Sequence, residues 1–278
     1  MPRPIPPDLG PRVWPIGVAL VVLCAGLVAI HAYLVGTQCD PGAEGPVRFG
    51  LPFLLMSAGA SSAWIGFVAV AAARLGRESE RSRLGLVETV GFGPLEGLVA
   101  LAGALAASQA ADLALRLSGA GRGTSLTSML ESLAGARGGQ LVTALLVIGL
   151  ATGVAEELFF RGYVQRRLVR RFGPVAGVVA AAALFGLFHF DPQHSAYAFV
   201  FGMFVGMVAL WTGSTWPAIG LHAVNNAASI LFVGLGVDRA AAVTPATRAP
   251  LAAAFAGCAA VALTSAWWIR RRTRAAAA

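Results

Sequence analysis

Apolar runs long enough to cross a lipid bilayer recur along this chain, and they limit its possible folds more than any other feature. A transmembrane helix needs about 20 mostly apolar residues, and runs of that length begin near residues 13, 51 and 93 and recur further along. The runs lack the alternation of polar and apolar residues that marks barrel strands. Only 12% of the 278 residues are charged, against about a quarter in soluble domains. The sequence therefore predicts an all-α, polytopic membrane helix bundle.

We expect about eight transmembrane helices in one bundle, because no stretch is long and polar enough to form a second, soluble domain. Residues 75–92 carry several charges and are expected to form a solvated cytoplasmic loop. Residues 117–140 are rich in Gly and Ser and are expected to be flexible. The expected spans are 13–36, 51–74, 93–115, 141–163, 174–190, 196–213, 216–235 and 250–269.

The arginines indicate the orientation of the bundle, since all 21 basic residues are arginines. If the first span starts on the cytoplasmic side, 15 of them face the cytoplasm and 6 face the other side, as the positive-inside rule requires. We therefore expect a multi-pass protein of the cell membrane with cytoplasmic tails at residues 1–12 and 270–278. Because the arginines flank apolar runs and form no single basic face, the lipid bilayer is an expected partner and nucleic acid is not.

Three charged residues, Glu156, Glu157 and Arg161, lie near the end of the fourth expected span. Each such group costs about 2.5–3.5 kcal/mol at mid-bilayer, so the cluster needs a reason. Residues four apart share a helix face, so Glu157 can pair with Arg161, while Glu156 faces elsewhere and is left for chemistry. The alternative is that both glutamates lie near the inner headgroups and Arg161 snorkels towards them.

A histidine in the fifth span, His189, can lie level with Glu156. Gly173-Pro174 is the only strong helix breaker between the fourth and fifth spans. Glu156 lies 17 residues before Gly173 and His189 lies 16 residues after it. Equal distances from the turn of an antiparallel hairpin mean equal depth, so the two side chains can meet. Taken alone, a histidine on an apolar helix is more often a packed or interfacial residue than a catalytic one.

The seventh span carries His222 and Asn226, which are four residues apart and share a helix face. A His and an Asn placed in this way can donate hydrogen bonds to one developing oxyanion, or they can simply satisfy each other. Asn225 is expected to point elsewhere. We expect the remaining candidates to be structural or interfacial, namely His31, His194 and the pair Asp112 and Arg116.

The polar residues favour water activation over nucleophilic catalysis. No Ser lies in a nucleophile-elbow context, and none of the three cysteines has an evident His partner. A water activated by Glu156 and His189, with His222 and Asn226 stabilising the oxyanion, fits the hydrolysis of an amide. A metal is an open alternative, because Glu156, His189 and His222 also form a zinc ligand set. The expected cofactor is therefore either none or a single divalent metal such as zinc.

The motifs Glu156-Glu157-x-x-x-Arg161, Phe185-x-x-x-His189 and His222-x-x-x-Asn226 follow one another on successive apolar helices. In this order they resemble the three motifs of the CPBP family, the CAAX protease and bacteriocin-processing, or Abi, family. That family is typified by the Ras-converting CAAX endopeptidase, and the resemblance covers residues 141–232. It implies that Glu156 and His189 activate the water, that Glu157 and Arg161 support the site, and that His222 and Asn226 form the oxyanion hole.

The expected function is that of an intramembrane endopeptidase acting on a membrane-bound or lipid-modified protein or peptide. The family has been described both as metalloproteases and as metal-independent glutamate proteases, and the residues fit either. A second hypothesis is a non-proteolytic membrane scaffold or bacteriocin-immunity protein that keeps the polar motifs for packing. A transporter is disfavoured, because no broken pair of helices recurs in matching halves. The catalytic core is expected within residues 141–235 of a bundle that covers residues 13–269.

Overall fold

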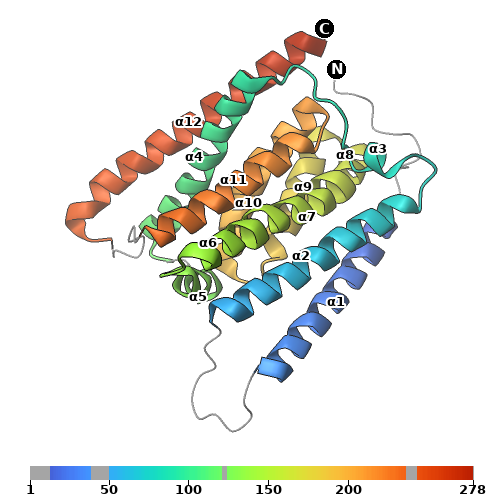
Figure 1. The fold of residues 1–278 in the computed structure, drawn as a ribbon. Helices are drawn as coiled ribbons and strands as arrows, with labels where there is room; N and C mark the ends of the chain where they lie inside the picture. The colour runs from blue at the N-terminus through green and yellow to red at the C-terminus, as the bar shows by residue number, and fades with distance from the viewer. Residues whose placement is uncertain (1–12, 39–49, 121–123, 236–242, 278) are drawn as a thin grey trace.

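The computed structural model of this chain describes residues 13–38, 50–120, 124–235 and 243–277, and this described part contains helices and no strands. Seven helices are long and apolar enough to cross a membrane, which confirms the predicted all-α, polytopic bundle (Figure 1). One of these seven is the continuous helical segment Gly138–Phe172. The other six are α1 (Trp14–Gln38), α2 (Leu51–Arg74), α4 (Pro94–Ser118), α10 (Pro192–Thr212), α11 (Trp216–Gly234) and α12 (Pro245–Ala277).

The segment Gly138–Phe172 is a helical run of 35 residues with two π-helical stretches. The predicted span 141–163 was too short, because the helix continues through the following arginines. Gly173, at φ 84°, then reverses the chain and Pro174 starts the next helix, so the turn lies where the sequence predicted it. The stretches are α6 (Gly138–Ala144), the π-helix η2 (Leu145–Ala151), α7 (Thr152–Glu157), the π-helix η3 (Leu158–Gln165) and α8 (Arg166–Phe172).

The next helix, α9 (Pro174–Leu187), has 14 residues and is therefore about 21 Å long, less than the about 30 Å of a hydrocarbon core. The predicted span 174–190 is wrong at its end, and the described chain holds seven full-length spans plus this short apolar helix. A tight turn ends α9. The His189 N–H donates to the Gly186 carbonyl, Phe190 adopts a φ of 53°, and Asp191 caps α10.

Two connections, one expected to be a solvated loop and the other to be flexible, contain helices. The connection at residues 75–92 contains α3 (Glu80–Arg83), and its backbone carbonyls at Leu84 and Val87 accept hydrogen bonds from Thr215 and Ser214, at 2.7 and 2.6 Å. The connection at residues 117–140 contains α5 (Thr124–Leu133). Leu133 is buried against η2 and α11, and this apolar contact holds α5 to the bundle.

The C-terminal helix α12 is also longer than predicted. The expected span 250–269 is part of Pro245–Ala277, so residues 270–277 of the predicted tail continue the helix. Arg272 donates to Glu96 of α4 at 3.0 Å, which fixes this end of α12 against its neighbour. The other predicted tail, residues 1–12, lies outside the described residues.

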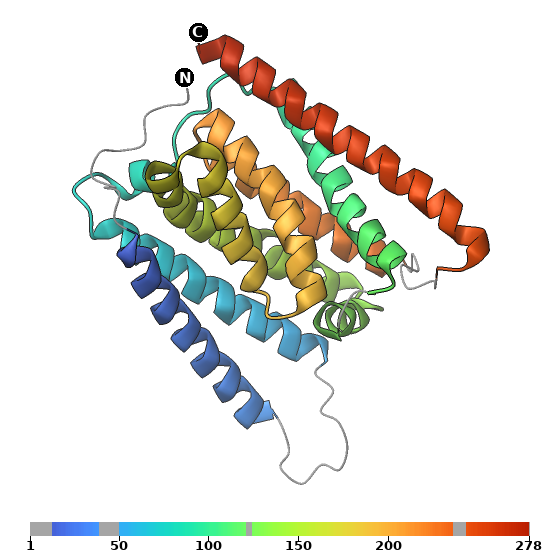
Figure 2. The same ribbon diagram turned by 180° about the vertical axis from the view of Figure 1, so that it is seen from behind.

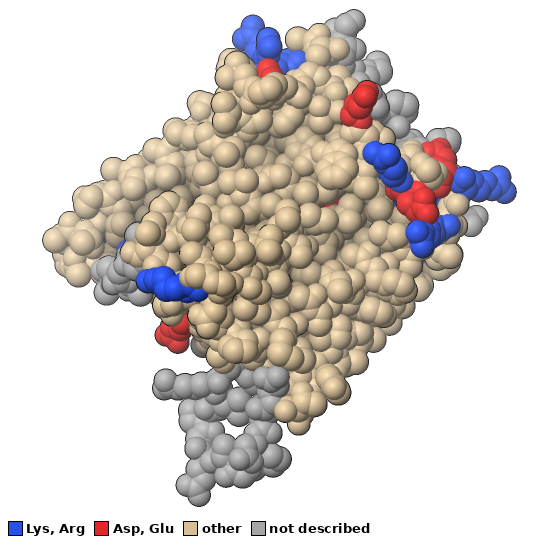
Figure 3. Space-filling model, in the orientation of Figure 1, with Lys and Arg blue, Asp and Glu red and all other residues tan. Residues whose placement is uncertain are grey.

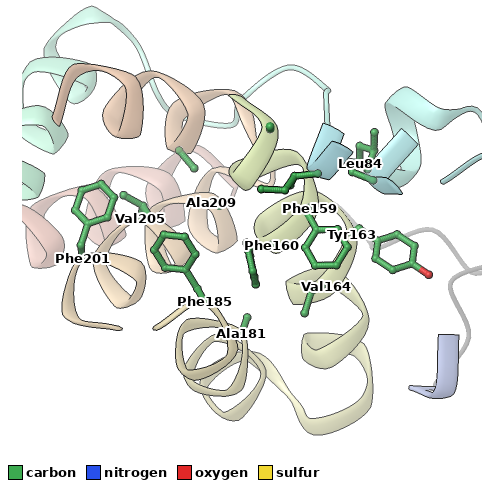
Figure 4. Packing of buried hydrophobic residues seen from close by; sticks show 14 of the residues in the cluster. Leu84, Phe159, Phe160, Tyr163, Val164, Ala181, Phe185, Phe201, Val205 and Ala209 are labelled. Atoms are coloured by element: carbon green, nitrogen blue, oxygen red, sulfur yellow. The ribbon is translucent and has the colours of Figure 1, made fainter. Parts of the chain in front are cut away.

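Aromatic side chains of η3 form the centre of the core. Phe159 and Phe160 are fully buried, and the Phe160 ring makes an edge contact with Phe185 of α9 at 5.1 Å between centroids (Figure 4). Small residues let the backbones approach. A Cβ on Gly177 would lie 2.4 Å from the Val169 backbone, so α8 and α9 pack this closely only because Gly177 has no side chain.

The two ends of the bundle carry different elements. We use the name arginine-rich end for the end with α3, α8 and the C-terminus of α12, and α5 end for the end with α5, the start of α6 and the α9–α10 turn (Figures 1 and 2). Figure 3 shows charged side chains near both ends of the visible face and a broad uncharged band between them. Such a band is the surface expected of helices that face lipid.

Candidate active site

A buried ion pair lies at the centre of the site. Arg161 of η3 donates to Oε1 of Glu157 of α7 at 2.9 Å, and both side chains are almost completely buried. This confirms the pairing that the four-residue spacing predicted. Arg161 also donates to the Gly202 carbonyl of α10 at 3.1 Å, so the pair joins two helices.

The third member of this network is His222 of α11. Its Nδ1 lies 2.8 Å from Oε1 of Glu157. An ionised carboxylate can only accept, so Nδ1 carries the proton and donates. In the neutral ring this leaves Nε2 with a lone pair, and Nε2 faces Glu156 at 3.7 Å from its Oε2. Glu157 therefore orients the imidazole and presents its second nitrogen to the other glutamate.

Carbonyl groups of the π-helical stretch η2 accept hydrogen bonds that hold α7 in place. A π-helix is rare, is found mostly as a short bulge near functional sites, and changes the usual carbonyl pairing. In η2 the Ile148 carbonyl accepts a hydrogen bond from Asn226 Nδ2 of α11 at 3.1 Å, and the Val147 carbonyl accepts one from Thr152 at 3.1 Å. Asn226 therefore ties α11 to the helix that carries both glutamates. Its second amide N–H is not used in this bond, and the oxyanion role stays a prediction.

His189 lies just beyond the end of α9, with Nδ1 2.9 Å from the Phe185 carbonyl. A carbonyl accepts, so Nδ1 carries the proton and Nε2 is the acceptor of the neutral ring. The Phe185 ring makes edge contacts with both His189 and His222, at 5.0 and 5.8 Å between centroids. The two imidazoles thus contact the same aromatic ring.

A cavity of about 270 Å³ brings the predicted residues together, because Glu156, His189, His222 and Asn226 all line it. Its wall is formed by residues of α2, α4, α5, α9, α10, α11 and the long segment Gly138–Phe172. The equal depth of Glu156 and His189 that the turn at Gly173 predicted is consistent with their place in one cavity. Their joint activation of water remains a prediction.

The cavity also contains residues that the sequence reasoning set aside. His194 is on the first turn of α10, and its ring lies 4.2 Å from that of His189. Asn225 donates to the Tyr197 hydroxyl at 3.4 Å, although it was expected to point elsewhere. Asp112, which was also expected to be structural, lines the same wall.

Signals for these residues were present in the sequence. Asp191-Pro192 is a typical helix start, with Asp at the cap and Pro at the first turn. Recognising it would have placed His194 and Tyr197, three residues apart, on one face of α10. Asn225 is three residues after His222, a spacing that also shares a helix face.

The proposed zinc ligands do not form a metal set as they are arranged here. Among the described residues, no three His, Cys, Asp or Glu side chains come together in a group that could hold a metal ion. Glu156 and His222 are 3.7 Å apart, and His189, whose Nδ1 is bound to the Phe185 carbonyl of its own hairpin arm, does not join them in such a group. We therefore derive no catalytic step through a metal.

Comparison with known proteins gives one match, to the central part of the chain. Residues 138–228 match the family model of the type II CAAX prenyl endopeptidase Rce1-like proteins. The match extends from the start of α6 into α11 and includes Glu156, Glu157, Arg161, His189, His222 and Asn226. No curated protein and no solved structure gave a match.

Proposed function

We propose that this chain is an intramembrane endopeptidase that cleaves a membrane-associated protein or peptide, because residues 138–228 match the family model of the Rce1-like CAAX prenyl endopeptidases. The match agrees with the resemblance found in the three sequence motifs. The observation that carries the proposal is the position of Glu156, a buried carboxylate that lines a cavity inside a membrane bundle beside Nε2 of His222. A carboxylate in this position is suited to act as a general base.

In the proposed reaction, Glu156 takes a proton from a water in the cavity, and the water oxygen attacks the carbonyl carbon of the scissile amide. His189 lines the same cavity, and its Nε2 helps Glu156 to activate the water. The C–N bond then breaks, and Glu156 returns the proton to the leaving amine. Proton transfer by a positioned base contributes about 10²–10⁴-fold to such a rate.

His222 and Asn226 are the proposed donors to the oxyanion. The proposed role needs the cationic form of His222, in which Nδ1–H is donated to Glu157 and Nε2 also carries a proton that it directs towards the cavity. Asn226 uses one amide N–H for the Ile148 carbonyl and has a second one for the oxyanion. Glu157 and Arg161 are positioning residues in this scheme, because they hold His222 and α7 in place and do not line the cavity.

A non-proteolytic scaffold is the second candidate, and one observation favours it. Arg161, His222 and Asn226 each make a hydrogen bond that joins two helical segments, so packing alone could explain why they are polar. Glu156 separates the two candidates. Among the described residues its ion-pair partner is His222 at 3.7 Å, which is longer than a hydrogen bond.

The test is a cleavage assay on purified full-length protein with a panel of single-span membrane peptides, read out by mass spectrometry. We expect the unchanged protein to cut at least one peptide and Glu156→Gln to be slower by about 10²–10⁴-fold. Glu80→Gln is the matched control, since Glu80 is a surface glutamate in α3 that pairs with Arg74. Cleavage that survives in a folded Glu156→Gln variant would contradict the proposal, and a chelator added to the same assay separates the metal-dependent from the metal-independent type.

A further inference from the structure

The two ends of the bundle differ in charge. Within the described residues, the arginine-rich end carries the arginines of α3, α8, the connection from α2 to α3 and the C-terminal parts of α2 and α12, whereas the α5 end carries Arg116, Arg137 and Arg248. The positive-inside rule places the richer end in the cytoplasm. The arginines of the richer end are Arg74, Arg77, Arg81, Arg83, Arg166, Arg167, Arg170, Arg171, Arg270, Arg271, Arg272 and Arg274.

The catalytic cavity extends from Glu156 towards the α5 end. Each long helix that lines it does so mainly with residues nearer to that end. In α10, for example, the lining residues begin at His194, on the first turn, and stop at Phe201, although the helix continues to Thr212. The lining residues of α2 lie between Ala58 and Ile65, those of α4 between Ser108 and Asp112, and those of α11 between His222 and Ile230.

The other side of Glu156 is filled. Between it and the arginine-rich end lie the Glu157–Arg161 pair, the fully buried Phe160 and the side chain of Gln165, which donates to the Gly206 carbonyl at 2.9 Å. Gln165 is itself buried, so this bond closes the space between η3 and α10. A peptide approaching from the arginine-rich end would have to break these contacts before it reached Glu156.

The cavity instead continues towards the α5 end and sideways. Met129 and Leu133 of α5 form part of its wall. A second cavity of about 460 Å³ lies between α4 and α11 and shares Gln109, Asp112, Asn225 and Ser229 with the first. Its remaining wall is largely apolar, so the shared residues connect the polar site to a space between two membrane helices.

We propose that the scissile peptide bond reaches Glu156 from the α5 end, which is the non-cytoplasmic side of the membrane. This inference rests on the proposed function and adds a substrate class to it. The substrate is a membrane-anchored peptide whose cleavage region lies in the non-cytoplasmic half of the bilayer or just outside it. A translocation step must therefore precede cleavage, because the peptide has to be carried to that side first. A segment that stays on the cytoplasmic side is not a substrate.

Cysteine accessibility in intact cells tests this proposal without depending on activity. Cys24, Cys39 and Cys258 are first replaced by serine in the full-length chain. Leu75→Cys and Leu235→Cys are a matched pair, since both are exposed leucines that cap a helix C-terminus, one at each end of the bundle. Ser61→Cys and, on the same helix, Ala58→Cys place the thiol in the wall of the catalytic cavity. Phe67→Cys is the control for a thiol on the exposed face of α2.

The readout is labelling by a small, membrane-impermeant thiol reagent before and after permeabilisation. We expect Leu235→Cys and at least one cavity variant to be labelled in intact cells, Leu75→Cys only after permeabilisation, and Phe67→Cys in neither case. Labelling of Leu75→Cys in intact cells would overturn the orientation. Cavity variants that are labelled only after permeabilisation, or not at all, would overturn the direction of access. A protein that is inactive in every cleavage assay but gives the expected labelling would refute the proposed function and leave this topology intact.

Discussion

Replacing Arg161 by methionine removes the guanidinium from the centre of the site and leaves the Glu157 carboxylate behind. The pair is held at 2.9 Å, and the side chains of Arg161 and Glu157 are 1% and 0% exposed. Water therefore cannot take over the lost hydrogen bond. The guanidinium also lies over the Phe185 ring at 4.4 Å and donates to the Gly202 carbonyl, so the variant removes three contacts at once.

Breaking a buried ion pair in this way costs about 3–5 kcal/mol, because the Glu157 carboxylate then stays buried without its cation and keeps only the hydrogen bond from His222. An exposed pair of the same length provides the scale for comparison. Arg74 and Glu80 are also 2.9 Å apart, but their side chains are 69% and 42% exposed. Surface pairs contribute only about 0.2–1 kcal/mol, so Arg74→Met should change the free energy of unfolding by no more than that.

Denaturant unfolding in mixed micelles measures these differences, and a double-mutant cycle with Glu157→Leu isolates their cause. The double variant should be more stable than Arg161→Met alone, because it no longer buries a carboxylate that has lost its cation. A loss below about 1 kcal/mol for Arg161→Met would refute the reasoning, since it would equal the surface pair. A double variant that is less stable than Arg161→Met would refute it as well.

Two further stability predictions follow from single contacts. Asn226→Leu should lower the free energy of unfolding by about 1–3 kcal/mol in the same titration, because the Ile148 carbonyl loses its donor; an unchanged midpoint would contradict this role. Gly177→Ala should cost about 1–3 kcal/mol, since a Cβ would overlap the Val169 backbone. The control Gly220→Ala meets no atom within 4 Å and should gain about 0.5–1 kcal/mol, so equal effects of the two substitutions would contradict the packing explanation.

Helical spacing predicted the contacts that lie along one helix or across one turn. Glu157 and Arg161 are four residues apart, and a pair at that spacing needs no knowledge of the rest of the fold. The turn at Gly173-Pro174 was equally local, and its position places Glu156 and His189 in one cavity. Both inferences use only the geometry of a helix and the conformational limits of Gly and Pro.

Contacts between distant helices could not be predicted in this way. The bond from His222 to Glu157 depends on how α11 crosses α7, and no spacing within either helix determines it. The π-helical stretch η2 could not be predicted for the same reason, because the donor to its Ile148 carbonyl is Asn226 of another helix. The end of α9 was predicted wrongly for a different reason. Mostly apolar residues surround His189 in the stretch 184–190, so no signal in the sequence indicated the turn at this position.

The direct test of the central claim, that Glu156 activates a water for attack on the peptide bond, is a single-turnover cleavage in water enriched in oxygen-18. If Glu156 acts as a general base, the attacking oxygen comes from the solvent, and each new carboxyl terminus should carry one oxygen-18 atom after the first turnover. A product without the label, together with oxygen-18 in the Glu156 carboxylate, would show that Glu156 attacks the substrate itself and would contradict the account.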